Sequence, residues 1–173
     1  MTIWTVGHST RTLDALIDLL RAHGVTQLAD VRTVPKSRRH PHVAGDALSR
    51  SLPEHGIAYR HFKLLGGLRK PRRDSINSAW RNESFRGYAD YMQSDDFERG
   101  LQELMAWSAD GPTAIMCAEA VWWRCHRQLI ADALVARGIE VRHITGPGAA
   151  ASHAITEFAR VDANRHVTYP GLV

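Results

Sequence analysis

The chain contains only two cysteines among its 173 residues, Cys117 and Cys125. Two thiols are too few to staple a domain of this size with disulfides, and their sequence neighbours are polar. No apolar run approaches the ~20 residues that a membrane span needs. The first residues, MTIWTVGHS, lack the basic region and the long apolar stretch of a signal peptide. The sequence therefore predicts a cytoplasmic protein with free thiols and no membrane partner.

The overall composition has no strong bias. Hydrophobic residues make up 44% and charged residues 23%, as in an ordinary soluble globular protein. The length fits one domain, and no internal repeat is visible. The formal net charge of +4 favours an anionic partner, depending on where the charge lies. Neither a cofactor nor an oligomeric state is defined by the sequence.

Strand and helix patterns alternate along the chain. Helical spacing is clearest at Leu13, Leu16, Ile17 and Leu20, which share one face. The expected strands span residues 3–7, 27–32, 57–62, 113–117 and 140–144. Further helical patterns lie at residues 45–55, 85–92, 97–105 and 129–134. This alternation predicts a single α/β domain over residues 1–173. We expect a mostly parallel, open, Rossmann-like sheet of about five strands in the order 3-2-1-4-5, with helices on both faces.

Two segments interrupt this alternation. Residues 63–86 are rich in arginine, glycine and polar side chains without a clean period, which predicts a basic surface excursion. From about residue 146 the chain is rich in glycine, alanine and serine, which predicts a weakly ordered C-terminal tail.

Reactive side chains follow several of the expected strands. In an open parallel sheet, ligands bind outside the carboxyl ends of the strands. Strands one and four are expected side by side, so that the residues following them face each other across a cleft. The candidate catalytic residues are Cys117, Glu119, Cys125, Asp30 and His8. Cys125, His126 and Arg127 are expected in the first turn of a helix, where the helix dipole and the arginine favour a thiolate.

The same edge offers groups for an anion. Gly7 would let the backbone approach a ligand, and Ser9 and the helix start after it would present free N–H groups. Arginine side chains can hold a phosphate or carboxylate with two hydrogen bonds. The candidate ligand-binding residues are Ser9, Arg32, Arg124, His126, Arg127, Lys63 and Arg69.

Several of these residues also have a purely structural interpretation. Cys117 at the end of an apolar strand is often a small buried hydrophobe. Asp30 and Arg32 can form an ion pair across their turn. His126 lies at helical spacing with apolar residues, as a half-buried structural histidine would. Aromatic residues interleave with the second half of the basic excursion, which is the composition of a single-stranded nucleic-acid site. The structural alternative there is a solvated loop.

An ordered set of motifs carries a resemblance to a known family. The motifs are GHST near the start, DVR followed by a proline, LGGLR at residues 65–69, the FRGYADYM helix and CAE…CHR. With them the chain resembles domain-of-unknown-function family 488, whose members are small bacterial and archaeal proteins, from Ile3 to about Ile144. The resemblance implies membership and no particular reaction. The linker of residues 120–123 is less polar than is usual there, which would suit a flatter or more aromatic ligand.

The CAE…CHR segment is also similar, more distantly, to rhodanese-like and phosphatase-like sites. In those sites a strand leads to a cysteine and then to an arginine at a helix start. Arg124 comes one residue late for the phosphatase spacing, and the loop is poorer in glycine.

Three functions are compatible with these observations. The first is an enzyme that acts on a phosphate-bearing substrate, such as a nucleotide or nucleic acid, through a reactive cysteine and a carboxylate. The second is a metal-binding protein, since Cys117, Cys125, His126 and His8 are ligand types for zinc or iron, although no CxxC or HxxxH spacing occurs. We therefore assign no metal ligands. The third is a non-catalytic module that binds nucleic acid.

Overall fold

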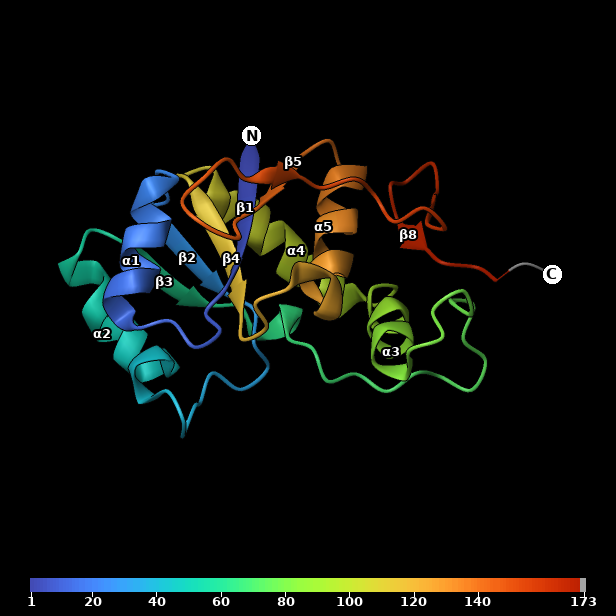
Figure 1. The fold of residues 1–173 in the computed structure, drawn as a ribbon. Coiled ribbons are helices and arrows are strands. Elements are labelled where there is room, and N and C mark those ends of the chain that lie inside the picture. The colour runs from blue at the N-terminus through green and yellow to red at the C-terminus, as the bar shows by residue number, and fades with distance from the viewer. Residues whose placement is uncertain (172–173) are drawn as a thin grey trace.

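A six-stranded sheet forms the centre of the structure, a computed structural model that describes residues 1–171 (Figure 1). Its strands are β1 (Thr2–Gly7), β2 (Gln27–Asp30), β3 (Ala58–His61), β4 (Thr113–Cys117), β5 (Glu140–His143) and β6 (Ala151–Ser152). All neighbouring strands are parallel except β5 and β6. The predicted α/β class and mostly parallel sheet are therefore confirmed.

Side chains alternate between the two faces of the central strands. In β4, Ile115 and Cys117 belong to one apolar core and Ala114 and Met116 to the other. Every residue of β2 and β4 is buried, as is typical of the central strands of a parallel sheet that is covered on both faces. The sheet therefore has a hydrophobic core on each face.

Helices cover both faces, as predicted (Figure 1). The buried side chains of α1 (Leu13–Ala22) and α2 (Gly45–Glu54) share one core, and those of α4 (Asp95–Ser108) and α5 (Arg127–Ala136) share the other with α3 (Glu83–Tyr91). Three short 3-10 helices are η1 (Pro41–Val43), η2 (Lys63–Leu65) and η3 (Trp122–Arg124). No helix within residues 1–171 combines the length and the apolar character that crossing a membrane requires.

The strand order corrects the prediction. The observed order is β3-β2-β4-β1-β5-β6, so β4, and not β1, lies beside β2. The predicted neighbours β1 and β4 do pair, with Gly7 opposite Cys117. The crossover through α1 is long enough to pass over one intervening strand. Because β4 is buried throughout, its sequence contains no signal for which neighbours it takes in the sheet.

The segment after residue 146 carries more regular structure than the predicted weakly ordered tail. It supplies β6 and a hairpin of β7 (Arg160–Val161) and β8 (Val167–Thr168). Val167 and Tyr169 are buried in the core on the α5 side of the sheet. Their partners lie far away in the sequence, so local periodicity does not reveal them.

The basic excursion is mostly irregular between η2 and α3, and side-chain hydrogen bonds join it to the rest of the domain. Ser75 Oγ and Asn77 Nδ2 both donate to Asp90 of α3, at 2.6 and 2.8 Å. Asn77 is fully buried, and its side-chain oxygen accepts the backbone N–H of Tyr169. The excursion and the C-terminal segment are therefore joined by hydrogen bonds.

Candidate functional site

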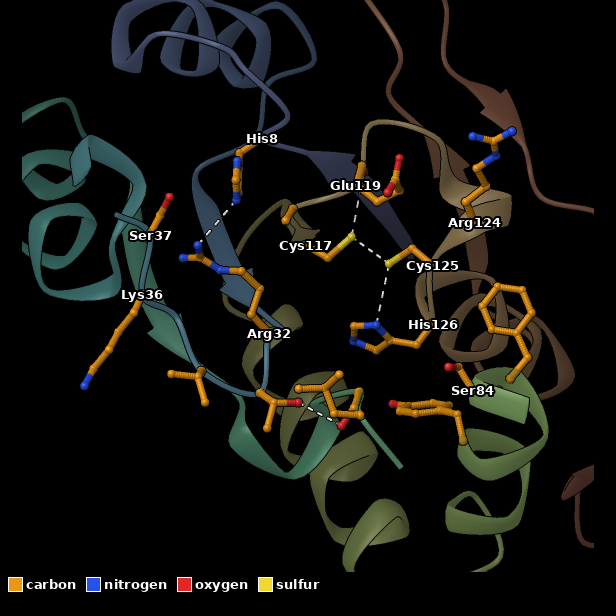
Figure 2. A pocket seen from close by; sticks show the side chains of 17 residues that line it. His8, Arg32, Lys36, Ser37, Ser84, Cys117, Glu119, Arg124, Cys125 and His126 are labelled. Carbon is orange, nitrogen blue, oxygen red and sulfur yellow. Dashed lines mark hydrogen bonds between the residues drawn. The ribbon is translucent and has the colours of Figure 1, made fainter. Parts of the chain in front are cut away.

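A cleft of about 440 Å³ lies where β1, β2 and β4 end. Of the predicted site residues, the cleft is lined by His8, Arg32, Cys117, Glu119, Arg124, Cys125 and His126. Figure 2 shows the two sulfurs and His126 facing a wall that carries His8, Arg32, Lys36 and Ser37. The structure thus brings together residues that follow three different strands.

The two cysteines form a close pair in this cleft. Both are free thiols, and their sulfurs lie 2.6 Å apart. Cys117 is the last residue of β4, and Cys125 lies between η3 and α5. Cys125 was expected inside the first helical turn, but its backbone is extended and α5 begins at Arg127. Its sulfur still accepts the Arg127 backbone N–H at 3.4 Å, so it occupies the place of a capping side chain.

The surroundings of the two sulfurs differ. The hydrogen bond from Cys117 lowers the pKa of Cys125 most, His126 and Arg127 lower it further, and burial opposes them. Burial raises the pKa of Cys117 well above its usual range, and the neighbouring Cys125 adds to this effect. One proton shared between two close sulfurs favours one thiolate and one thiol. We assign the thiolate to Cys125 and the thiol to Cys117.

His126 is held in a fixed orientation against Cys125. Its Nε2 donates to the backbone oxygen of Val31 at 2.8 Å, and its Nδ1 lies 3.5 Å from the Cys125 sulfur. Since a carbonyl can only accept, Nε2 carries a proton and Nδ1 faces the sulfur. Gly67 permits this position, because a Cβ there would lie 3.1 Å from Nδ1. A cysteine, a histidine and an orienting oxygen have the arrangement of an activated nucleophile.

The opposite wall is built around a buried ion pair. Arg32 donates to both carboxylate oxygens of Asp30, at 2.9 and 2.7 Å, and Tyr59 Oη donates to the same group at 2.6 Å. Asp30 is fully buried and does not line the cleft. The structure therefore shows the ion pair that the sequence offered as the structural alternative, and it places Arg32, without Asp30, at the cleft.

His8 presents a neutral ring beside Arg32. Burial lowers the pKa of His8, and Arg32 lowers it further, although the Ser9 carbonyl favours the charged form. Its Nδ1 donates to that carbonyl at 2.9 Å, which leaves Nε2 as an acceptor 3.4 Å from Arg32 Nη1. The remaining lone pair of His8, on Nε2, faces Arg32 Nη1 in this long contact and is the position at which the ring can accept a proton.

The predicted backbone roles of Gly7 and Ser9 are wrong. A Cβ at Gly7 would lie 1.9 Å from the carbonyl oxygen of Glu119. The missing side chain therefore makes room for the loop after Cys117, and not for a ligand. The N–H groups of His8 and Ser9 donate to the carbonyls of Cys117 and Ala118, both at 3.0 Å. The ladder between β1 and β4 continues past the strand ends and uses the Ser9 N–H that was expected to bind an anion.

Arg127 is buried behind the cleft and does not line it. Its side chain is 1% exposed and donates to the carbonyl of Glu119 at 2.6 Å and to Thr5 Oγ1 at 3.2 Å. It therefore holds the loop after Cys117, which corrects its predicted role as part of an anion clamp.

A chain of buried hydrogen bonds extends from Arg127 to Asp132. Thr5 Oγ1 lies 2.6 Å from His143 Nδ1, and His143 Nε2 lies 2.8 Å from His153 Nδ1. His153 Nε2 lies 2.7 Å from Asp132 Oδ1. Because an arginine can only donate and a carboxylate can only accept, every proton along this relay points toward Asp132 when both histidines are neutral.

The relay predicts acid sensitivity. Burial, with help from His153 and Arg127, lowers the pKa of His143 to about 3. An unfolded histidine titrates near 6.5, so the unfolded chain binds the proton first as the pH falls. The stabilisation is complete above about pH 6.5 and is lost as the pH falls toward 3. We expect His143 alone to lower the free energy of unfolding by about 2 kcal/mol between pH 7 and pH 5.

Urea unfolding at several pH values measures this loss. In a His143→Gln variant, the free energy of unfolding should fall less between pH 7 and pH 5 than in the wild type, whatever the stability of the variant at pH 7. Equal slopes in both proteins would contradict the assignment of a neutral His143.

Other predicted ligand-binding residues lie outside the cleft. Lys63 is exposed on η2, and the guanidinium of Arg69 lies over the Tyr91 ring at 3.6 Å. Two aromatic residues near the basic excursion also pack inward. Trp80 contacts the rings of Phe158 and Tyr169, and Tyr88 is 1% exposed. These rings are therefore occupied by packing contacts.

The prediction missed several residues that line the cleft. They are Thr33, Val34, Lys36, Ser37, Gly67, Leu68, Ser84, Phe85 and Tyr88. Lys36 lies in the basic run after β2 and Phe85 begins a helical pattern, but neither spacing indicates a site. Within residues 1–171, no three His, Cys, Asp or Glu side chains are grouped so that they could hold a metal ion.

Together, the fold and the site define an α/β protein with a buried thiol pair in a cleft at the carboxyl ends of parallel strands. The chain belongs to the family described as Domain of unknown function DUF488, whose family model matches residues 12–134. The predicted family membership is thereby confirmed. No curated protein and no solved structure shows a significant match to the chain.

Proposed function

We propose that this protein is an enzyme in which the Cys125 thiolate attacks an anionic substrate held in the cleft. The observation that carries the proposal is the position of the Cys125 sulfur. This sulfur contacts the Cys117 thiol, His126 Nδ1 and the Arg127 N–H. Cys125 also lines a cleft that is large enough for a small ligand. Hydrogen-bond donors stabilise a thiolate, which is the reactive form of cysteine.

The charges around the cleft support an anionic substrate. Its charged lining residues are three cations, Arg32, Lys36 and Arg124, and one carboxylate, Glu119. Lys36 and Arg124 are exposed at the mouth, while Arg32 is fixed by its ion pair. Leu68 and Phe85 add apolar surface on another wall. A ligand with an acidic group and an apolar body would match this lining.

Proton transfer can be assigned to residues near the sulfur. Glu119 is exposed at the cleft mouth, and its carboxylate can accept a proton there. His8 Nε2 can accept one from a water or hydroxyl group on the opposite wall. Asp30 is fully engaged with Arg32 and Tyr59, so it takes no part in this assignment.

Competing alkylating reagents test the nucleophile and the cations together. Iodoacetate is anionic and iodoacetamide is neutral, and both modify thiolates. We expect the ratio of the iodoacetate rate to the iodoacetamide rate to be about tenfold higher at Cys125 than for free cysteine, because the cations concentrate the anion. An Arg124→Gln and Lys36→Gln double variant should move the ratio toward that of free cysteine.

Lys63→Gln provides the matched control, since it removes an exposed cation outside the cleft. This variant should keep the wild-type ratio. Cys125→Ser should abolish the rapid modification. Labelling that survives Cys125→Ser, or a wild-type ratio equal to that of free cysteine, would overturn the proposal.

A further inference from the structure

We propose that Cys117 and Cys125 form a dithiol–disulfide couple and that the substrate of the cleft is a small anionic disulfide, which the pair reduces. This inference rests on the proposed function, since it uses the same nucleophile and the same cleft. It adds a reaction, a substrate class and a role for Cys117 as the resolving thiol.

The contact between the sulfurs is the first support. At 2.6 Å they are closer to each other than either is to any other hydrogen-bond partner. Cys117 is 3% and Cys125 is 6% exposed, and both line the cleft. A disulfide requires sulfurs about 2.0 Å apart, so only a small approach separates the dithiol from the bonded form.

The difference between the two thiols is the second support. Thiol–disulfide exchange needs an attacking thiolate that a substrate can reach and a second thiol that reacts only afterwards. Cys125 accepts hydrogen bonds from the Cys117 thiol and the Arg127 N–H, and its sulfur faces His126 Nδ1 in the cleft. Among the described residues, the hydrogen-bond partners of the Cys117 sulfur are Cys125 and the Glu119 carbonyl, at 2.6 and 3.8 Å. The structure thus assigns attack to Cys125 and resolution to Cys117.

The reaction balances in two steps. The Cys125 thiolate attacks one sulfur of a disulfide R–S–S–R, so that a Cys125–S–S–R bond forms and RS⁻ leaves. Cys117 then gives its proton to this RS⁻ and attacks the Cys125 sulfur, and the second RS⁻ leaves. The products are the Cys117–Cys125 disulfide, RSH and RS⁻, and two electrons have passed from the protein to the substrate. Two equivalents of another thiol, oxidised in turn, restore the dithiol.

The second step uses groups that are already in place. When Cys125 is joined to R, its sulfur no longer needs a hydrogen bond from Cys117, and the Cys117 proton becomes available to the leaving group. The Cys117 sulfur remains beside the atom that it attacks, because β4 and the loop held by Arg127 fix both residues. Resolution therefore requires no large rearrangement of the fold.

The lining of the cleft selects the disulfide by charge. Arg32, Lys36 and Arg124 outnumber Glu119, so a disulfide that carries carboxylates is favoured over a neutral or cationic one. The probes are oxidised glutathione, which is anionic, hydroxyethyl disulfide, which is neutral, and cystamine, which is cationic. We expect oxidised glutathione to react at least about tenfold faster than the other two, each relative to its rate with free cysteine.

Intact mass spectrometry of the whole reduced chain after each probe separates the steps. The wild type should end as an internal disulfide without a bound probe, and dithiothreitol should restore it. Cys117→Ser should stop at a stable mixed disulfide on Cys125. Cys125→Ser should react slowly and form no internal disulfide. Far-UV circular dichroism of each variant verifies that it is folded, and Cys117→Ala provides a second variant for the resolving step.

The outcomes distinguish this inference from the proposed function. If the wild type also stops at the mixed disulfide while Cys125 still prefers iodoacetate, the dithiol couple is overturned and the proposed function stands. If Cys125→Ser reacts like the wild type, both are overturned. An internal disulfide that forms equally fast with all three probes overturns the anionic substrate class.

Discussion

Between pH 8 and pH 5, the rate at which iodoacetamide modifies Cys125 is expected to stay nearly constant, whereas an ordinary thiol slows by about 1000-fold. Only the thiolate reacts, and for a thiol with a pKa near 8.5 its fraction falls about tenfold per pH unit. The hydrogen bond from Cys117, followed by His126 and Arg127, lowers the pKa of Cys125 to about 3. Cys125 therefore remains a thiolate throughout this range.

Two variants at Cys117 test whether its hydrogen bond lowers the pKa of Cys125. Cys117→Ala removes the main donor, so the rate at Cys125 should begin to fall at a higher pH than in the wild type. Cys117→Ser retains a hydroxyl donor, so the pH at which its rate begins to fall should lie between those of the wild type and Cys117→Ala. Stopped-flow alkylation with peptide mapping assigns the signal to Cys125. A wild-type profile that follows free cysteine would contradict the assignment of the thiolate.

A second large effect is expected at Asp132, which does not line the cleft. This side chain is fully buried and accepts hydrogen bonds from His153, Tyr169 Oη and the Thr156 N–H, at 2.7, 2.7 and 2.9 Å. Asp132→Ala leaves three buried donors without their acceptor. We expect the free energy of unfolding to fall by on the order of 4 kcal/mol, since each orphaned group costs about 1–3 kcal/mol. Urea denaturation at pH 7 measures the change.

Asp96→Ala is the matched control for Asp132. Asp96 is exposed in the first turn of α4 and pairs with Arg99 one turn later. Its removal should cost less than about 1 kcal/mol. Similar losses for both aspartates would show that the buried acceptor has no special role in joining the C-terminal segment to α5.

The Asp132 network also connects the C-terminal segment to the cleft. His153 and Tyr169 come from that segment, and the relay through His143 and Thr5 ends at Arg127, which holds the loop after Cys117. The fold therefore uses residues after 146 to support a site built from the earlier strands. The relay from Arg127 to Asp132 can lie in the interior because its polar side chains are hydrogen-bonded to one another.

Local patterns predicted the elements well, because they depend on neighbouring residues. The apolar run at residues 113–117 is β4, and Thr12 caps α1 by accepting the N–H of Ala15 at 3.1 Å. The convergence of His8 and Cys117 also followed from a local fact. Parallel strands end at one edge, so residues that directly follow them meet there.

The failures share a different cause. The free N–H expected at Ser9 donates to Ala118, and the anion clamp expected of Arg127 is replaced by its bond to the Glu119 carbonyl. In both cases a carbonyl of the loop after Cys117 takes the donor. A sequence shows that a group can donate, but it does not show which acceptor reaches that group first.

The amino-acid sequence by itself determined the α/β class, most of the strand and helix segments and the edge of the sheet at which the candidate site lies, because hydrophobic periodicity and strand direction are local properties. Only the tertiary structure decided that β4 separates β1 from β2, that Cys117 touches Cys125 and that Asp30 is closed off by Arg32 and Tyr59. These facts depend on how the chain packs in three dimensions, and the spacing of the residues in the sequence does not give them. Burial and hydrogen bonding then decide which of the polar groups remain available for a ligand.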